Sequence, residues 1–321
     1  MKKILFIIIL FGTIMFTGYI MRPKDTDVCV QQISDFHSIE KNTLDAIVYG
    51  SSHSWLGFDA KEFESITGYR TYNYSCFWQS FNTTWLFIND SFITQTPKVV
   101  FVDVGRVNDY LHDMELEGQI YYTRKLKISK EKITFLIQCF GNNLEGYISY
   151  CFPIVSFHNK WENISELFEE KQHNDFISSS GQMISNGHTS FKNELIGYNM
   201  RSDDEMTEYI LSINEYEGGE IGEQDICPEN IVLMNDITDK CKEKNIRLIW
   251  YVTPYVGDFN YDRAMKDYVS KNGGEYINLF EHINDIGLDA KSDFSDSDHL
   301  NASGAKKVAA YFANHINNFD N

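Results

Sequence analysis

The chain has 321 residues, of which 43% are hydrophobic and 23% charged, a composition typical of a folded globular protein and not of a disordered one. Its formal net charge of -18 and its lack of an extended basic stripe argue against a nucleic-acid partner, since phosphate binding requires clustered Lys and Arg. The six cysteines are scattered without a Cys-x-x-Cys spacing, so no zinc site is expected, and we predict neither a metal nor a cofactor.

The N-terminus carries an apolar run from Ile4 to Ile20, preceded by two lysines. Its length is close to the roughly 17–25 residues that a membrane-spanning helix needs. No Ala-x-Ala type of cleavage site follows it. We therefore predict that residues 1–24 form an uncleaved signal anchor in the cytoplasmic membrane, with residues 25–321 outside the cell. Cleavage and secretion is the alternative.

After this run, short apolar segments alternate with amphipathic ones. Asp59 suits a helix N-cap and Gly68 a helix end. In chain order we expect a strand at 45–50, a helix at 59–66, a strand at 70–75, a helix at 79–93 and a strand at 98–104. The alternation returns with a helix at 228–244, a strand at 246–253, a helix at 262–272, a strand at 275–279 and a final helix at 303–316.

Strands that alternate with helices predict a parallel sheet covered on both faces. The expected fold class is therefore α/β, a flavodoxin-like three-layer αβα arrangement around a mostly parallel five-stranded sheet. Residues from about 106 to 225 break the pattern, and we interpret them as a large helical insertion in one domain. Within them, the aromatic stretch Pro153 to Trp161 includes His158 and is expected to pack as a cluster or to line a cleft.

Sites in such sheets lie at the carboxyl ends of the strands. Gly50-Ser-Ser-His53 follows the first strand, where Gly permits a sharp turn and a Ser hydroxyl would be exposed. Near the other end of the chain, Asp296-Ser-Asp-His299 precedes the last helix. An Asp three residues before a His can orient the imidazole and stabilise its charged form. Each motif alone also fits an ordinary polar turn.

Together the two motifs resemble the SGNH/GDSL hydrolase superfamily. Ser52 falls on the nucleophile position of that family's first block, and Asp296 and His299 fall on its last block. The resemblance extends in element order over most of the chain after residue 40. A more specific resemblance is to membrane-anchored members of this superfamily on bacterial surfaces. They include O-acetyltransferases of cell-surface glycans and the D-alanyl transfer protein of teichoic acid synthesis.

The resemblance also implies donors to an oxyanion hole. The segment Asn73 to Ser80 lies where the second block supplies a backbone donor, but its Gly is missing, and Ser75 or Cys76 is nearest to that place. The third block, Gly-x-Asn-Asp in the family, is one residue longer here. The side-chain donor therefore stays open among three candidates: Asn108, Arg106 and Gln79.

The family implies acyl transfer through an acyl-enzyme on Ser52. Water as acceptor would make the protein an esterase, and a sugar or polyol hydroxyl would make it an acyltransferase. The expected substrate is an acylated carbohydrate or cell-wall polymer at the cell surface, and a membrane acyltransferase is a candidate partner. The competing hypothesis is a non-catalytic surface protein that binds glycan or assists assembly on the same fold.

Overall fold

The structure is a computed structural model, and it describes residues 2–21, 28–114, 116–156, 182–183, 189–190, 222, 225–255, 259–289, 292–296 and 298–320. Residues His158 and Trp161 of the predicted aromatic stretch lie outside this range.

The centre of the molecule is a sheet of five strands, all of them parallel, in the order β2-β1-β3-β6-β7. The strands are β1 (Ala46–Tyr49), β2 (Thr71–Asn73), β3 (Val99–Asp103), β6 (Arg247–Val252) and β7 (Glu275–Asn278). Almost every strand residue is buried, as both-face coverage of a parallel sheet requires. The predicted α/β class with a central five-stranded sheet is confirmed, and the sheet is parallel throughout rather than mostly parallel.

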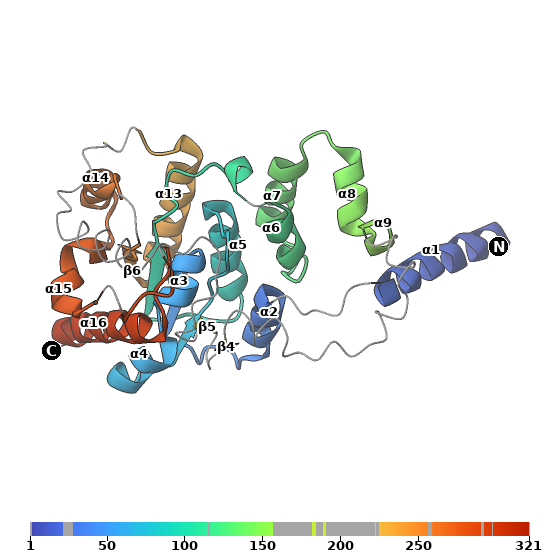
Figure 1. Ribbon diagram of the computed structural model, residues 1–321. Coiled ribbons are helices and arrows are strands. Elements are labelled where there is room, and N and C mark those ends of the chain that lie inside the picture. The colour runs from blue at the N-terminus through green and yellow to red at the C-terminus, as the bar shows by residue number, and fades with distance from the viewer. Residues whose placement is uncertain are drawn as a thin grey trace.

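Helices cover both faces of the sheet (Figure 1). Right-handed crossovers put α4 and the last helix on one face and the helices between β2 and β7 on the other. In agreement, α4 packs against α16, and α5 packs against α13. The bounds are α4 (Ala60–Thr67), α5 (Phe81–Ser91), α13 (Pro228–Glu243), α14 (Asp262–Asn272) and α16 (Ala302–Asp320). All five helices were predicted within a few residues.

Local sequence explains the ends of α4. The side chain of Asp59 accepts hydrogen bonds from the backbone N–H groups of Lys61 and Glu62, each at 3.0 Å. Gly68 ends the helix at a φ of 73°, a left-handed conformation that favours Gly. Shorter elements complete this part of the molecule: α2 (Val28–Ser38), α3 (Ser52–Gly57), η4 (Leu279–His282) and α15 (Ile283–Ile286).

The segment between β3 and α13 is helix-rich where it is described. It contains η1 (Leu111–Asp113), α6 (Leu116–Thr123), α7 (Lys130–Phe140), α8 (Leu144–Cys151), α9 (Pro153–Ser156) and a two-stranded antiparallel ribbon of β4 (Gln182–Met183) and β5 (Thr189–Ser190). Helices α7 and α8 stand away from the sheet (Figure 1). Helix α8 packs on α9, and α9 packs on α1.

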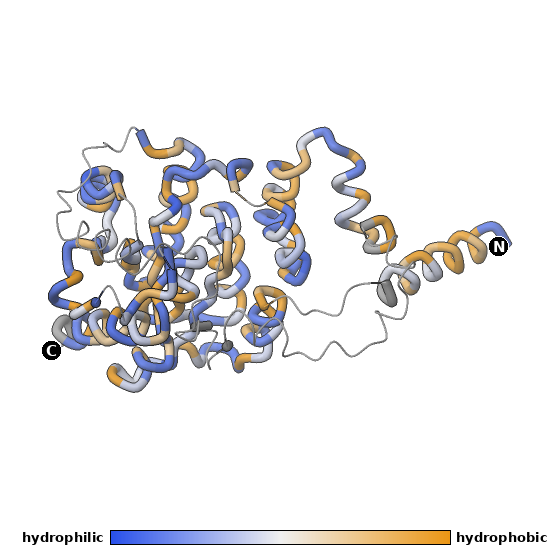
Figure 2. The backbone as a smooth tube through the Cα atoms, viewed as in Figure 1, coloured by the Kyte–Doolittle hydropathy of each residue, from blue (hydrophilic) through white to orange (hydrophobic). Residues whose placement is uncertain are grey.

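Helix α1 (Lys2–Met21) packs on α9, where the rings of Phe11 and Phe152 meet edge to face at 6.3 Å. Figure 2 shows α1 as an almost continuous hydrophobic segment. Each residue from Ile4 to Phe11 is about half exposed or more, so apolar side chains reach solvent on every side of this helix. Among the described residues, no helix has both the length and the hydropathy needed to cross a bilayer.

Candidate active site

The nucleophile candidate is placed by the sheet itself. Strand β1 is completely buried and ends at Tyr49, after which Gly50 turns the chain. A Cβ on Gly50 would collide with the side chains of Ser54 and Asp103, so only Gly fits this turn. Helix α3 then begins at Ser52, which brings this residue to the carboxyl edge of the sheet.

The Asp296 and His299 motif lies on a loop that is held by side chains. Asn301 donates from Nδ2 to the carbonyl of Ser292 at 2.8 Å, and its Oδ1 accepts from the N–H of Ser303 at 2.8 Å. One side chain thus joins the start of the loop to the first turn of α16. The fully buried Asp293 forms an ion pair with Lys307 of α16 at 2.6 Å.

These two parts of the chain meet, although 247 residues separate them. Ser52 Oγ lies 2.9 Å from His299 Nε2, and His299 Nδ1 lies 2.9 and 3.0 Å from the two carboxylate oxygens of Asp296. Because a carboxylate can only accept, the neutral imidazole carries its proton on Nδ1 and leaves Nε2 to accept from the Ser52 hydroxyl. The geometry is that of a Ser–His–Asp triad.

The electrostatics of the loop keep Asp296 ionised. Partial burial raises the pKa of this carboxyl, but the hydrogen bond and charge of the His299 ring and the N–H groups of Asp298 and His299 outweigh burial, and the net pKa is lowered. Those N–H groups donate to Asp296 Oδ1 at 2.7 and 2.8 Å. An ionised Asp296 stabilises the imidazolium that forms when His299 takes a proton.

The turn after β2 places Ser75, Cys76 and Gln79 at the same edge of the sheet, all three of them buried. The N–H of Cys76 is shared between the carbonyl of Gly50 at 3.2 Å and Gln79 Oε1 at 2.9 Å. The Nε2 of Gln79 donates to Thr84 Oγ1 at 3.0 Å. Gln79 therefore uses both ends of its amide to shape the turn, and Cys76 donates within the turn.

The other two donor candidates follow β3. Asn108 Oδ1 accepts from the N–H of Cys227, which precedes α13, at 2.8 Å. Arg106 donates to Asp109 at 3.2 Å, and its guanidinium lies 5.8 Å from the centre of the half-exposed Trp78 ring. Asn108 thus fixes the chain where α13 begins, and Arg106 forms a cation–π contact with the turn after β2.

A buried polar chain lies under the nucleophile. The hydroxyl of Tyr251 on β6 donates to Ser54 Oγ at 2.7 Å, and Ser54 donates to Asp103 at 2.9 Å. Burial raises the pKa of Asp103 to about 6, against the lowering effect of hydrogen bonds from the Gly105 N–H and Ser54. Asp103 was missed by the sequence analysis, since its only signal is its place at the end of a predicted strand.

His53, which follows the nucleophile, is a second imidazole at the site. It is 4% exposed, stacks on the ring of Tyr255 at 4.8 Å between centroids, and lies 5.5 Å from the ring of His299. Burial, followed by the charges of His299 and Arg106, lowers the pKa of His53 well below its ordinary value. The sequence indicated this residue only as the last member of the Gly50-Ser-Ser-His53 motif.

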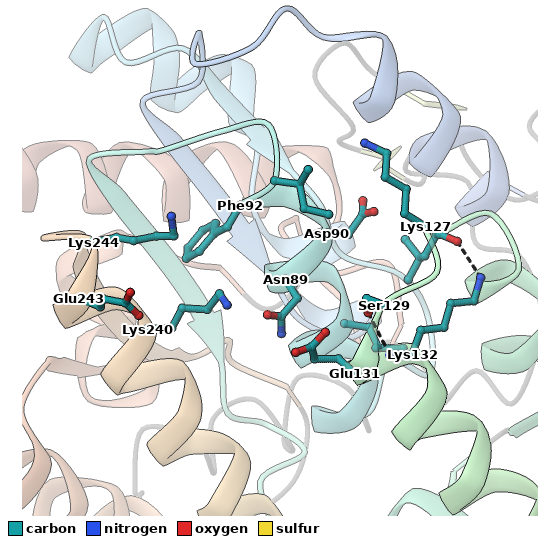
Figure 3. Close-up of a pocket in the computed structure, with 13 residues that line it drawn as sticks. Asn89, Asp90, Phe92, Lys127, Ser129, Glu131, Lys132, Lys240, Glu243 and Lys244 are labelled. Atoms are coloured by element: carbon teal, nitrogen blue, oxygen red, sulfur yellow. Dashed lines mark hydrogen bonds between the residues drawn. The ribbon is translucent and has the colours of Figure 1, made fainter.

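A cavity of about 470 Å³ lies elsewhere, between the C-terminal ends of α5 and α13 and the start of α7. Figure 3 shows that it is lined by lysines, among them Lys132 and Lys240, and by acidic side chains such as Asp90 and Glu131. Helices that connect parallel strands run antiparallel to those strands. The C-terminal ends of α5 and α13 therefore lie at the opposite edge of the sheet from Ser52. No triad residue lines the cavity.

The described part of the chain contains no group of three or more His, Cys, Asp or Glu side chains arranged to hold a metal ion. Four of the six cysteines are buried.

No protein-family model matches the chain, and no curated protein matches it. Among solved structures, the chain is similar to a protein from Bacteroides fragilis described as a "putative acylhydrolase", with a TM-score of 0.40 and 10% sequence identity. The alignment covers 93% of this chain and 99% of that one.

Proposed function

We propose that the protein is a serine-dependent esterase or O-acyltransferase of the SGNH/GDSL type that works through an acyl-enzyme on Ser52. The observation that carries the proposal is the continuous relay from Ser52 Oγ through His299 to Asp296, with each step between 2.9 and 3.0 Å. A serine hydroxyl is a weak nucleophile until an adjacent base accepts its proton, and this relay supplies the base.

The proposed reaction has two balanced steps. In the first, His299 Nε2 takes the Ser52 proton while Oγ bonds to the acyl carbon, then returns that proton to the departing alkoxide, which leaves as an alcohol. In the second, His299 takes a proton from water or from an acceptor hydroxyl, the resulting oxygen attacks the acyl carbon, and Ser52 regains a proton as it leaves. A positioned base of this kind contributes about 10²–10⁴-fold to the rate.

The substrate class in this proposal is an acylated carbohydrate or cell-wall polymer. Support comes from the aromatic and cationic side chains near the nucleophile: Trp78 with Arg106, and Tyr255 against His53. Aromatic faces suit sugar rings and acyl chains, and the same relay serves hydrolysis and transfer, so the acceptor distinguishes the two activities. A membrane acyltransferase that supplies or receives the acyl group is the proposed partner.

We also propose that the N-terminal segment holds the protein at the outer face of the cytoplasmic membrane. The support is that every side chain from Ile4 to Phe11 stays about half exposed or more, although α1 packs on α9. Flotation of the full chain with lipid vesicles, compared with a chain that lacks residues 1–24, tests this: equal behaviour of the two would contradict it.

The activity is tested with acetyl esters and longer-chain esters, and with a fluorophosphonate probe, on wild type and two matched variants. Ser52→Ala should abolish turnover and labelling. Ser51→Ala is the control, because the neighbouring Ser51 hydroxyl is buried and has no hydrogen-bond partner among the described residues, so its loss should leave turnover near wild type. Turnover that survives in Ser52→Ala would refute the nucleophile. Folded wild-type protein that neither turns over nor labels would favour the non-catalytic glycan-binding hypothesis.

A further inference from the structure

The inference concerns His53 and rests on the proposed function. The residue follows Ser52 on α3, and its ring is held in place by the Tyr255 stack, with an interplanar angle of 20°. On another side stands Gly105, where an added Cβ would lie 3.3 Å from His53 Nδ1. A ring so confined has little rotamer freedom, which is how side chains that act on a substrate are pre-organised.

The two nitrogens of this ring differ. Nδ1 is enclosed and has no hydrogen-bond partner among the described residues, whereas Nε2 is equally unpartnered but is not enclosed. A buried N–H donor without an acceptor is costly, so the neutral ring avoids a proton on Nδ1 and carries it on Nε2. Burial lowers the pKa of His53, which agrees with a neutral ring. His53 thus presents a single N–H donor at its accessible end.

The proposed reaction needs a side-chain N–H donor to the oxyanion. Charge develops on the acyl oxygen in the tetrahedral intermediate, and serine enzymes stabilise it with fixed N–H groups. Gln79 uses both ends of its amide in the turn after β2, and the side chain of Asn108 bonds to the start of α13 and to Tyr261. Arg106 donates one N–H to Asp109 and packs over Trp78, while its Nε is buried without a hydrogen-bond partner among the described residues. None of these three is as close in the chain to Ser52 as His53.

We propose that His53 Nε2–H, together with the backbone N–H of Ser52, binds the acyl oxygen of the substrate and makes His53 the side-chain donor of the oxyanion hole. The donor hydrogen-bonds to the carbonyl oxygen in the ester and more strongly to the oxyanion after Ser52 attacks. His53 neither gains nor loses a proton in the cycle, because His299 performs every proton transfer. The two imidazoles therefore have separate roles: one is the base and the other a neutral donor.

Three substitutions at His53 distinguish this role from a structural one. The amide nitrogen of Gln reaches approximately the position of Nε2, and that of Asn approximately the position of Nδ1. His53→Leu should lower kcat for ester hydrolysis by about 10²–10³-fold, as removal of one oxyanion donor does, with little change in KM. His53→Gln should recover much of this loss, and His53→Asn should resemble His53→Leu. Affinity for a boronate that forms a tetrahedral adduct should fall in parallel with kcat.

Thermal unfolding of each variant is measured alongside. Wild-type kcat in His53→Leu would overturn the proposal, and so would equal rates in the Gln and Asn variants. If His53→Leu does not fold, the Gln and Asn pair still decides the question. Failure of the proposed function has a different signature, because the wild-type protein would then show no turnover that Ser52→Ala abolishes.

Discussion

The two halves of the site are held in place by different kinds of interaction. The half that carries Ser52 continues a fully buried strand, and its turn is shaped by the lack of room around Gly50. The half that carries Asp296 and His299 is a loop without a strand, in which the two side chains remain 34% and 21% exposed. Hydrophobic burial positions the nucleophile, whereas hydrogen bonds and one buried ion pair position the base.

This difference predicts distinct sensitivities. Damage to the loop should affect the base and leave the sheet intact, whereas damage to the turn after β1 should affect both the site and the core. Three sets of substitutions break or sharpen this contrast, and a fourth probes an ion pair on β7 outside both halves; they are ordered from the largest expected effect to the smallest.

Asp296→Asn should lower kcat by about 10⁴-fold, because the amide can stabilise neither the required tautomer nor the charged form of His299. The matched control is Asp298→Asn, since Asp298 is on the same loop and its backbone N–H, not its side chain, bonds to Asp296. Steady-state ester hydrolysis measures both. Equal rates in the two variants would show that Asp296 does not orient the base.

Lys307→Met should reduce the free energy of unfolding by about 3 kcal/mol, because it leaves the carboxylate of fully buried Asp293 without its cation. Urea denaturation measures the change. Lys306→Met is the control, since Lys306 is exposed and forms no ion pair in the described structure. The double variant Asp293→Asn with Lys307→Met should regain part of the loss; no difference between the two lysine variants would contradict an ionic clamp on the loop.

Gly50→Ala and Gly304→Ala test one glycine in each half, and each should cost about 2 kcal/mol through overpacking. The new methyl group would collide with two side chains at Gly50 and with the carbonyl of Asp293 at Gly304. Gly12→Ala on α1 is the control, because a Cβ there meets nothing within 4 Å. If the melting temperatures of both variants equalled that of the Gly12→Ala control, neither half would depend on a close backbone approach.

Glu275→Gln should cost about 1 kcal/mol at neutral pH, a value reduced for partial exposure. Burial raises the pKa of Glu275, but hydrogen bonds and charge from His315 and Arg247 lower it to about 2, below its ordinary value of 4.5. The stabilisation is therefore complete above about pH 4.5 and is lost as pH falls towards 2. The variant should flatten the pH dependence of stability in that window; an unchanged slope would contradict this.

Most of the sheet could be predicted from the sequence because its strands are short apolar runs bounded by clear end signals. Asp59 and Gly68 marked α4, and Pro228 marked the start of α13. Helix α3 could not be predicted, since Ser-His-Ser-Trp-Leu-Gly has weak helix propensity and its buried Trp55 and Leu56 supply the stabilisation only in the folded protein.

The triad residues were predictable because two short motifs, one after the first strand and one before the last helix, together resemble a known family. In an open parallel sheet, sites form at the carboxyl edge of the strands, and the structure brings Ser52 and His299 together there. The donors were less predictable, because their contacts come from distant segments: Asn108 bonds to Cys227, 119 residues further along. No local pattern reveals such a pairing, nor the stacking of His53 on Tyr255.

The account depends on acyl transfer to Ser52, and the acyl-enzyme itself is the most direct measurement. The protein is mixed with an acyl ester, quenched in acid during turnover, digested and examined by mass spectrometry. We predict one acyl group on the peptide that contains Ser52, and none on that peptide in Ser52→Ala. Turnover with an unmodified Ser52 peptide, or with the acyl group on another residue, would contradict the account.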